Sequence, residues 1–212
     1  MEAENLDGNP VETFNKNARR YAEKYFALSD YDEFYQRLLA SVAPAGSLID
    51  VACGPGNVSA YASRHRPDLE VVGVDLAPSM VEEARARVPG VVFEVCDCTR
   101  LESLGRAFDA AAFAFGLSYL TDDAAAQCLS SIRAILEEGA PLLLLTIASA
   151  EPMEKVETSS SGDRLLTVYR TPQQIAAMLE RQGFCITFVE RIASPDNATK
   201  VTHDLVLMAT RR

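Results

Sequence analysis

The sequence contains no apolar run of the length that a membrane-spanning helix requires. Such a helix needs about 20 consecutive apolar residues, whereas the longest apolar stretches here are as long as a single strand: residues 108–115, interrupted by Asp109, and 141–145. The N-terminal residues MEAENLDGNPVE are acidic and polar, which is unlike a signal or transit peptide. We therefore expect a cytoplasmic protein with no membrane association.

Basic residues are scarce and metal-binding patterns are missing. Twenty Lys and Arg stand against 30 Asp and Glu, which gives a net charge of −10, and no basic cluster is longer than the pairs Arg19-Arg20 and Arg211-Arg212. A protein that binds nucleic-acid phosphates needs a basic face, so we expect no nucleic-acid partner. The five cysteines are odd in number and have no second Cys or His pair at zinc spacing, which is typical of reduced thiols without a metal.

The length of 212 residues and an apolar content of 48% predict a single domain with a sizeable core. In residues 11–43, apolar and aromatic side chains recur at steps of three and four with a break at Ser29-Asp30, which predicts two helices. We divide the domain into a helical cap (11–43), a cofactor-binding core (47–147), a lid (150–170) and a C-terminal helix with the last two strands (171–212).

From residue 47 onwards, short apolar runs alternate with amphipathic segments. This alternation predicts an α/β fold of three layers, in which a mostly parallel, Rossmann-like sheet has helices on both faces. The expected strands are 47–51, 70–74, 91–95, 109–115, 141–147, 185–192 and 204–209, and the expected helices are 57–66, 79–88, 121–136 and one that begins after Thr171 and ends at Gly183.

Residues 150–163, AEPMEKVETSSSGD, interrupt this alternation because they are polar, rich in serine and without a period. Long irregular connections in compact domains are usually lids or binding loops. We expect an irregular lid here, with a disordered surface loop as the alternative.

A strand, a glycine turn and a helix follow one another at the start of the core. Gly54 and Gly56 allow the backbone to approach a ligand where a Cβ atom would collide, and the helix that follows begins with unpaired N–H groups. Asp50, Asp75 and Asp97 come at or near the ends of the first three strands of the core. Ends of parallel strands share one edge of a sheet, and open α/β sheets bind ligands at that edge.

A nicotinamide-dependent dehydrogenase is one alternative for such a turn. Its GxGxxG fingerprint requires Gly or Ala at position 59, where this chain has Ser59. The dehydrogenase remains the less favoured alternative.

Residues 15–211 resemble the small class I S-adenosylmethionine-dependent methyltransferases. The segments that carry the resemblance are 50–56 (DVACGPG), 74–80 (VDLAPSM), Asp97-Cys98, 108–115, 138–144 and 169–184. The resemblance implies a seven-stranded sheet with an antiparallel last strand and S-adenosylmethionine as the cofactor.

The resemblance also implies roles for individual residues. Asp50 fixes the turn or contacts the methionine amine, Asp75 binds both ribose hydroxyls, and Asp97 accepts from the adenine amine. The other implied cofactor contacts are Tyr21, Ala52, Gly54, Gly56, Leu76, Met80, Cys98 and Phe115. Ala52 stands where the family usually has glycine, and we expect it to be tolerated because it continues the strand with a negative φ.

The acceptor side of the site is less defined by sequence. Tyr21 and Tyr25 belong either to a helix that closes over the cofactor or to ordinary core packing. Candidates for substrate contact are Tyr25, Ser118, Tyr169 and Arg170, and candidates for catalysis are Tyr119 and His203. His203 is the preferred general base because an antiparallel last strand would begin at the ligand edge.

The acceptor is expected to be a small molecule. Amine-directed nucleic-acid methyltransferases typically have Asp or Asn followed by Pro-Pro-aromatic after the fourth strand, where this chain has Phe115-Gly116-Leu117-Ser118. A protein that binds S-adenosylmethionine or its product without catalysis remains an alternative, and either a monomer or a homodimer is compatible with the sequence.

Overall fold

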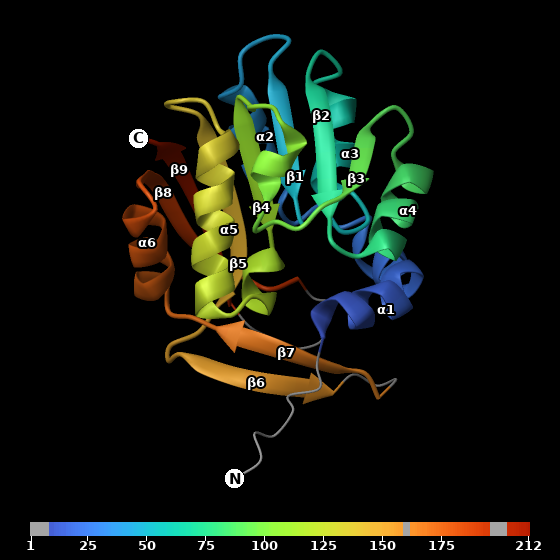
Figure 1. The fold of residues 1–212 in the computed structure, drawn as a ribbon, viewed down its shortest axis with the longest axis vertical. Coiled ribbons are helices and arrows are strands. Elements are labelled where there is room, and N and C mark those ends of the chain that lie inside the picture. Colours follow the sequence, from blue (N-terminus) through green and yellow to red (C-terminus); the bar gives the residue numbers. More distant parts are fainter. Residues whose placement is uncertain (1–8, 159–161, 196–202) are drawn as a thin grey trace.

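The structure is a computed structural model that describes residues 9–158, 162–195 and 203–212. Its centre is a seven-stranded sheet with the order β3-β2-β1-β4-β5-β9-β8 (Figure 1). The first five strands run parallel, and β9 lies between β5 and β8 and is antiparallel to both. The strands are β1 (Ser47–Val51), β2 (Glu70–Asp75), β3 (Val92–Val95), β4 (Ala110–Ala114), β5 (Pro141–Ala148), β8 (Phe184–Ala193) and β9 (His203–Arg211).

Helices cover both faces of this sheet because its central strands are apolar on both sides. The apolar core on one face includes side chains of α5 (Asp122–Ile135) and α6 (Pro172–Arg181). The core on the other face includes side chains of α2 (Asp32–Ala40) and α3 (Asn57–His65), and α4 (Pro78–Arg87) packs beside α3 and β3. The predicted three-layer, mostly parallel fold with an antiparallel last strand is therefore confirmed.

Several helices begin at the capping residues and the first-turn proline that the sequence indicates. Pro78 occupies the first turn of α4, and the Thr121 side chain accepts a hydrogen bond from the Ala124 N–H at the start of α5. Thr171 and Gln174 form a complete capping box at the start of α6. These contacts satisfy N–H groups that have no partner within the helix.

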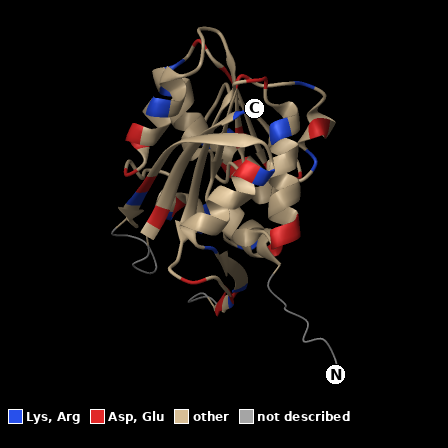
Figure 2. Ribbon diagram, turned by 90° about the vertical axis from the view of Figure 1, so that its left-hand side faces the viewer, with Lys and Arg blue, Asp and Glu red and all other residues tan. Residues whose placement is uncertain are grey.

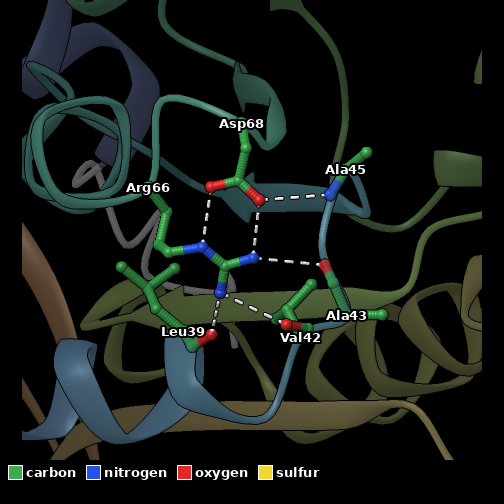
Figure 3. A network of polar contacts seen from close by, with 6 residues as sticks. All are labelled: Leu39, Val42, Ala43, Ala45, Arg66 and Asp68. Carbon is green, nitrogen blue, oxygen red and sulfur yellow. Dashed lines mark hydrogen bonds and ion pairs between the residues drawn. The ribbon is translucent and has the colours of Figure 1, made fainter.

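The two helices predicted in residues 11–43 are present, as α1 (Pro10–Tyr25) and α2, and α2 packs on one face of the sheet. Arg66, just after α3, joins α2 to the sheet (Figure 3). Its guanidinium donates to three carbonyl oxygens at the end of α2 and just beyond it, those of Leu39, Val42 and Ala43. Asp68 accepts from Nε and Nη2 of Arg66 at 2.8 Å and from the Ala45 N–H at 3.1 Å. The guanidinium beside Asp68 lowers the pKa of that carboxyl, so the pair stays charged at neutral pH.

The prediction that the segment after β5 is irregular was wrong, and its role as a lid stays a prediction. The chain forms a β-hairpin there, of β6 (Met153–Thr158) and β7 (Arg164–Tyr169), which pair antiparallel; residues 159–161 lie outside the described residues. Most β6 side chains are exposed or half-buried. The strand therefore lacks the alternating apolar face by which strands are recognised in sequence.

The hairpin and α1 lie beyond the carboxyl ends of the parallel strands (Figure 1). The side chains of Lys16 and Asn17 on α1 both reach Asp163 beside β7, and the Thr13 hydroxyl donates to the Arg164 carbonyl. The two segments therefore form a joint cover over one edge of the sheet.

Charged residues of both signs lie interspersed along the helices in the view of Figure 2. Within the described part of the chain, no helix is both long and apolar enough to span a bilayer.

Candidate functional site

The turn after β1 is held from inside the protein by Asp50. Its side chain is 1% exposed, and Oδ2 accepts from the Ser59 N–H at 3.0 Å and from the Ser59 hydroxyl at 2.7 Å. Burial raises the pKa of Asp50 to about 7, the nearby charge of Asp75 adds to the rise, and the two Ser59 hydrogen bonds oppose it. Of the two roles implied for Asp50, the structure therefore displays the structural one, in which it fixes the start of α3.

Asp75 ends β2 as expected and faces the same turn. Its Oδ2 accepts from the Gly54 N–H at 2.9 Å, and Oδ1 accepts from the Ala77 N–H at 2.9 Å. Burial raises the pKa of this carboxyl, although its backbone hydrogen bonds oppose the rise. Because a carboxylate offers about four acceptor positions, each oxygen can still accept from a ligand hydroxyl.

Gly54 leaves space in front of this carboxylate. Its φ is +53°, a conformation that favours glycine, and a Cβ placed on it would meet no atom within 4 Å. A carboxylate with free acceptor positions beside an open glycine turn fits a nucleoside with vicinal hydroxyls.

Asp97 and Cys98 lie at the neighbouring strand end. Oδ1 of Asp97 accepts from the N–H and the hydroxyl of Thr99, and the Cys96 N–H donates to the Asp75 carbonyl at 3.0 Å. The loops after β2 and β3 are thus joined, and Asp75 and Asp97 share one edge of the sheet. Among the described residues, no group of three or more His, Cys, Asp or Glu side chains is arranged to hold a metal.

Four other predicted cofactor contacts have different surroundings from one another. Leu76 is 42% exposed beside Asp75, whereas Met80 is 2% exposed and packs against Ala77 and α1. Gly56 has its closest neighbours, Phe93, Val88 and Ala84, in the protein itself, so its missing Cβ serves packing. Phe115 makes an edge contact with the Tyr31 ring at 5.1 Å and packs with the core on the α2 side.

Helix α1 lies over the edge of the sheet that contains Asp75, and hydrogen bonds join the helix to α3 and α4. The Asn57 side-chain amide, at the start of α3, donates to the Tyr25 carbonyl at 2.7 Å, and Asn15 Oδ1 accepts from the Ser79 N–H of α4 at 2.9 Å. Tyr21 lies between these ties with its ring 4.7 Å from that of Tyr25. Burial, together with the neighbours Tyr119, Tyr25 and Asp75, raises the pKa of Tyr21.

Tyr119 and Tyr169 continue this aromatic cluster away from Asp75. Tyr119 belongs to a short 3-10 helix, η2 (Gly116–Tyr119), and its ring lies 4.9 Å from that of Phe14. Burial raises the pKa of Tyr119 above the ordinary value of a phenol, so it is protonated at neutral pH and available as a hydrogen-bond donor. The Tyr169 hydroxyl donates to Glu157 at 3.0 Å, and burial with this carboxylate raises its pKa to about 12.

Two predicted substrate residues are part of the protein interior instead. The Ser118 hydroxyl is buried and lies 3.1 Å from the Thr146 hydroxyl on β5. Arg170 is 3% exposed, and its guanidinium bonds to Asp122 and to the carbonyls of Leu117 and Leu120. Arg170 thus clamps η2 to the start of α5, and neither side chain is available to an acceptor in this structure.

His203 lies where an antiparallel last strand should begin. It is exposed, pairs with Ala148 at the end of β5, and borders a cavity of about 480 Å³ next to the hairpin. His203 therefore lies at the edge formed by the carboxyl ends of the parallel strands, and its role as a base stays a prediction.

Sequence reasoning missed the residues that hold this site together. Ser59 was considered only as a departure from a dehydrogenase fingerprint, yet it supplies both hydrogen bonds to the Asp50 carboxylate. Asn15 and Asn57 act across 64 and 32 positions of the chain. Contacts between such distant polar residues leave no local periodic pattern that a single sequence would reveal.

Residues 48–139 match the family model described as "Methyltransferase domain". This segment contains the glycine turn and all three carboxylates. This match covers less than half of the chain and supports a class I S-adenosylmethionine-dependent methyltransferase.

Relatives of this chain differ widely in how much of their length they share with it. A demethylmenaquinone methyltransferase of Thermotoga maritima is 29% identical over 203 residues, which covers 80% of this chain and 86% of the relative. A trans-aconitate 2-methyltransferase of Methylobacterium radiotolerans is 49% identical over only 49 residues, 23% of this chain and 19% of the relative. Several others of the first curated relatives are likewise matched over less than two thirds of their own length.

A solved structure shares the fold over nearly the whole chain. It is that of a 1,6-didemethyltoxoflavin-N1-methyltransferase of Burkholderia thailandensis, with a TM-score of 0.71 and 20% identity over 95% of this chain and 84% of the other.

The departure of this chain from the family pattern at Ala52 has a structural consequence. The expectation of a negative φ was wrong, since Ala52 has φ +52° in the left-handed region. A Cβ placed on Gly116 would come within 2.9 Å of the Ala52 methyl, so the two loops are in close contact there. An L-residue in this conformation costs about 1–2 kcal/mol relative to its ordinary region.

We expect Ala52→Gly to stabilise the protein by about 0.5–1 kcal/mol, because the relief of strain exceeds the entropy that glycine loses on folding. Urea unfolding measures this change. The control is Ala86→Gly at an exposed position of α4, which should destabilise by about 1 kcal/mol. Destabilisation by both variants would contradict the strain at Ala52.

We compare the free energy of unfolding of the Asp50→Asn variant with that of the unmutated protein. We expect the variant to gain stability relative to the unmutated protein as the pH is raised from 5 to 8. The pKa of Asp50 is raised from 3.8 to about 7, so its contribution to stability is complete below pH 4 and is lost as the pH rises through 7. The free-energy difference should change by up to about 3 kcal/mol, since one pKa unit corresponds to about 1.4 kcal/mol.

Asp109→Asn is the matched control for this pH series. Asp109 also accepts from the N–H and hydroxyl of one serine, Ser47, but its pKa is lowered. Its contribution to stability is lost only in acid, so the difference for this variant should be constant between pH 5 and pH 8. Urea unfolding at pH 5 and pH 8 measures both differences in unfolding free energy. If the difference between Asp50→Asn and the unmutated protein is the same at both pH values, the pKa of Asp50 is not raised.

Proposed function

We propose that this protein transfers a methyl group from S-adenosylmethionine to a small-molecule acceptor. The observation that carries the proposal is the Asp75 carboxylate, which lies at the end of β2 beside the open Gly54 turn and keeps acceptor positions on both oxygens. Vicinal ribose hydroxyls match such a carboxylate, and β2 ends at the sheet edge where α/β folds bind nucleosides.

Other residues along this edge complete the cofactor site in the proposal. Asp97, with Cys98 beside it, would accept from the adenine amine, and Leu76 would lie against the adenine ring. Tyr21 of α1 would cover the ribose and methionine from the opposite side. Asp50 would act indirectly, by holding the turn through Ser59.

The bound cofactor supplies an activated methyl group on a sulfonium. The protein's own contribution is orientation, which can lower a barrier by about 7–11 kcal/mol when two reacting groups are held in line. Tyr119, which is protonated at neutral pH, would donate a hydrogen bond to the acceptor. A base is required only for an acceptor that loses its proton in the reaction, and His203 at the start of β9 would take that proton.

The names of several relatives support an acceptor of low molecular weight. They refer to a demethylated menaquinone, to trans-aconitate and to a didemethylated toxoflavin, whereas another relative acts on a malonyl group carried by an acyl-carrier protein. The first three are chemically different small molecules, so the family tolerates many acceptors on one cofactor scaffold.

We expect Asp75→Ala to weaken the binding of S-adenosylhomocysteine at least tenfold in calorimetric titration, because two charge-assisted hydrogen bonds to the ribose are lost. Asp123→Ala, at the exposed start of α5, is the control and should leave the Kd unchanged. Equal affinity of the Asp75→Ala variant and the unmutated protein would remove Asp75 from the site and overturn the proposal.

Turnover separates the enzyme from a protein that only binds the nucleoside. With methyl-labelled S-adenosylmethionine and a metabolite extract, the proposal predicts a labelled small molecule. Binding of the cofactor with no labelled product from any extract would support a sensor or partner subunit instead.

A further inference from the structure

The hairpin presents one of its faces to a cavity that the cofactor site does not use. Side chains alternate between the two faces of a strand, so Met153, Lys155 and Glu157 of β6 lie on the same face, and Tyr169 of β7 is paired opposite Met153. All four border the cavity of about 480 Å³, together with the end of β5. A volume of this size is typical of small-molecule sites.

Basic groups from three different strands meet at this cavity. Lys155 comes from β6, Arg191 from β8 and His203 from β9, and all three border it. Arg191 and His203 lie on the same face of the main sheet, since Arg191 pairs with Leu205 and His203 is two residues before Leu205. Such a gathering is notable in a chain with a net charge of −10.

Two cationic side chains and one carboxylate of the described residues border the cavity. Among the ion pairs between described residues, none includes Lys155 or Arg191. The carboxylate is that of Glu157, which accepts from the Tyr169 hydroxyl. Asp204, next to His203, is 2% exposed and is bonded to Tyr31 and Ser194.

The cavity lies beside the aromatic cluster that reaches the edge with Asp75. Tyr169 borders the cavity, and its strand β7 packs against η2, which carries Tyr119. The Phe14 ring of α1 contacts the rings of both Tyr119 and Tyr21.

We propose that this cavity binds an acidic group, a carboxylate or a phosphate, of the methyl acceptor, and that Lys155 and Arg191 recognise it. This inference rests on the proposed methyltransferase function and adds the acceptor's charge to it. Fork-shaped hydrogen bonding by Arg191 and the ammonium of Lys155 suit such anions. Apolar surface of Met153 would contact the uncharged part of the acceptor.

Binding of simple anions tests the site without knowledge of the acceptor. The titrants are tricarballylate, its neutral triamide and inorganic phosphate. Each is added to the free protein and to the protein saturated with S-adenosylhomocysteine. The NMR shifts of the backbone amides of Ala148, Tyr169 and His203 report binding. We expect at least one anion to bind and to shift these amides, and we expect the triamide not to bind. The tighter of the two anions identifies the acidic group as carboxylate or phosphate.

The double variant Lys155→Gln/Arg191→Gln should raise the Kd of that anion at least tenfold. Arg164→Gln is the matched control, because Arg164 is exposed on the opposite face of the same hairpin, and it should change the Kd less than twofold. Absence of anion binding, an equal effect of the control, or an unchanged Kd in the double variant would overturn the proposal.

The Kd of S-adenosylhomocysteine is measured on the same samples. We expect it to be unchanged in the double variant, which also shows that the variant is folded. If the nucleoside binds and the anions do not, the acidic-acceptor site is wrong while the proposed function stands. If the nucleoside fails to bind to the unmutated protein, the proposed function is wrong, whatever the anions do.

Discussion

The Asp75 carboxylate is the contact through which the sheet, the glycine turn and α4 are joined. It ends β2, accepts from the Gly54 N–H on one side and accepts from the Ala77 N–H just before α4 on the other. A buried carboxylate is costly unless its oxygens are hydrogen-bonded. The turn is thereby held open beside a negative charge, which is the combination that a nucleoside with two neighbouring hydroxyls requires. The turn's other support, Asp50 with Ser59, lies inside the protein and has no need of a ligand.

The edge above this carboxylate is covered by two segments that differ in chemistry. Helix α1 contributes Tyr21 and apolar packing and is tied to the core by Asn15 and Asn57. The hairpin β6–β7 contributes Lys155 and Tyr169 to a cavity further along the edge. The cofactor side is thus aromatic and acidic, and the far side is basic. A donor that carries a sulfonium and an acceptor that carries an acid would each meet surroundings of opposite charge.

The three layers and the mostly parallel sheet were predictable from sequence, because apolar periodicity and the spaced motifs are local. Thr171 with Gln174 and the strand end at Asp75 illustrate this. The hairpin was missed because its β6 face is exposed, and Ala52 was misjudged because a positive φ leaves no trace in a sequence that has alanine there. Ser118 and Arg170 were taken for substrate residues, yet burial and long-range hydrogen bonds place them in the interior. Such tertiary contacts are not encoded in any short window.

The most direct measurement of the central claim is a crystal structure of the protein with S-adenosylhomocysteine. Our account predicts both ribose hydroxyls within hydrogen-bond distance of Asp75, the adenine beside Asp97 and Cys98, and the sulfur directed towards Tyr119. Density for the nucleoside at any other edge or face of the sheet, with Asp75 bonded only to Gly54 and Ala77, would contradict it.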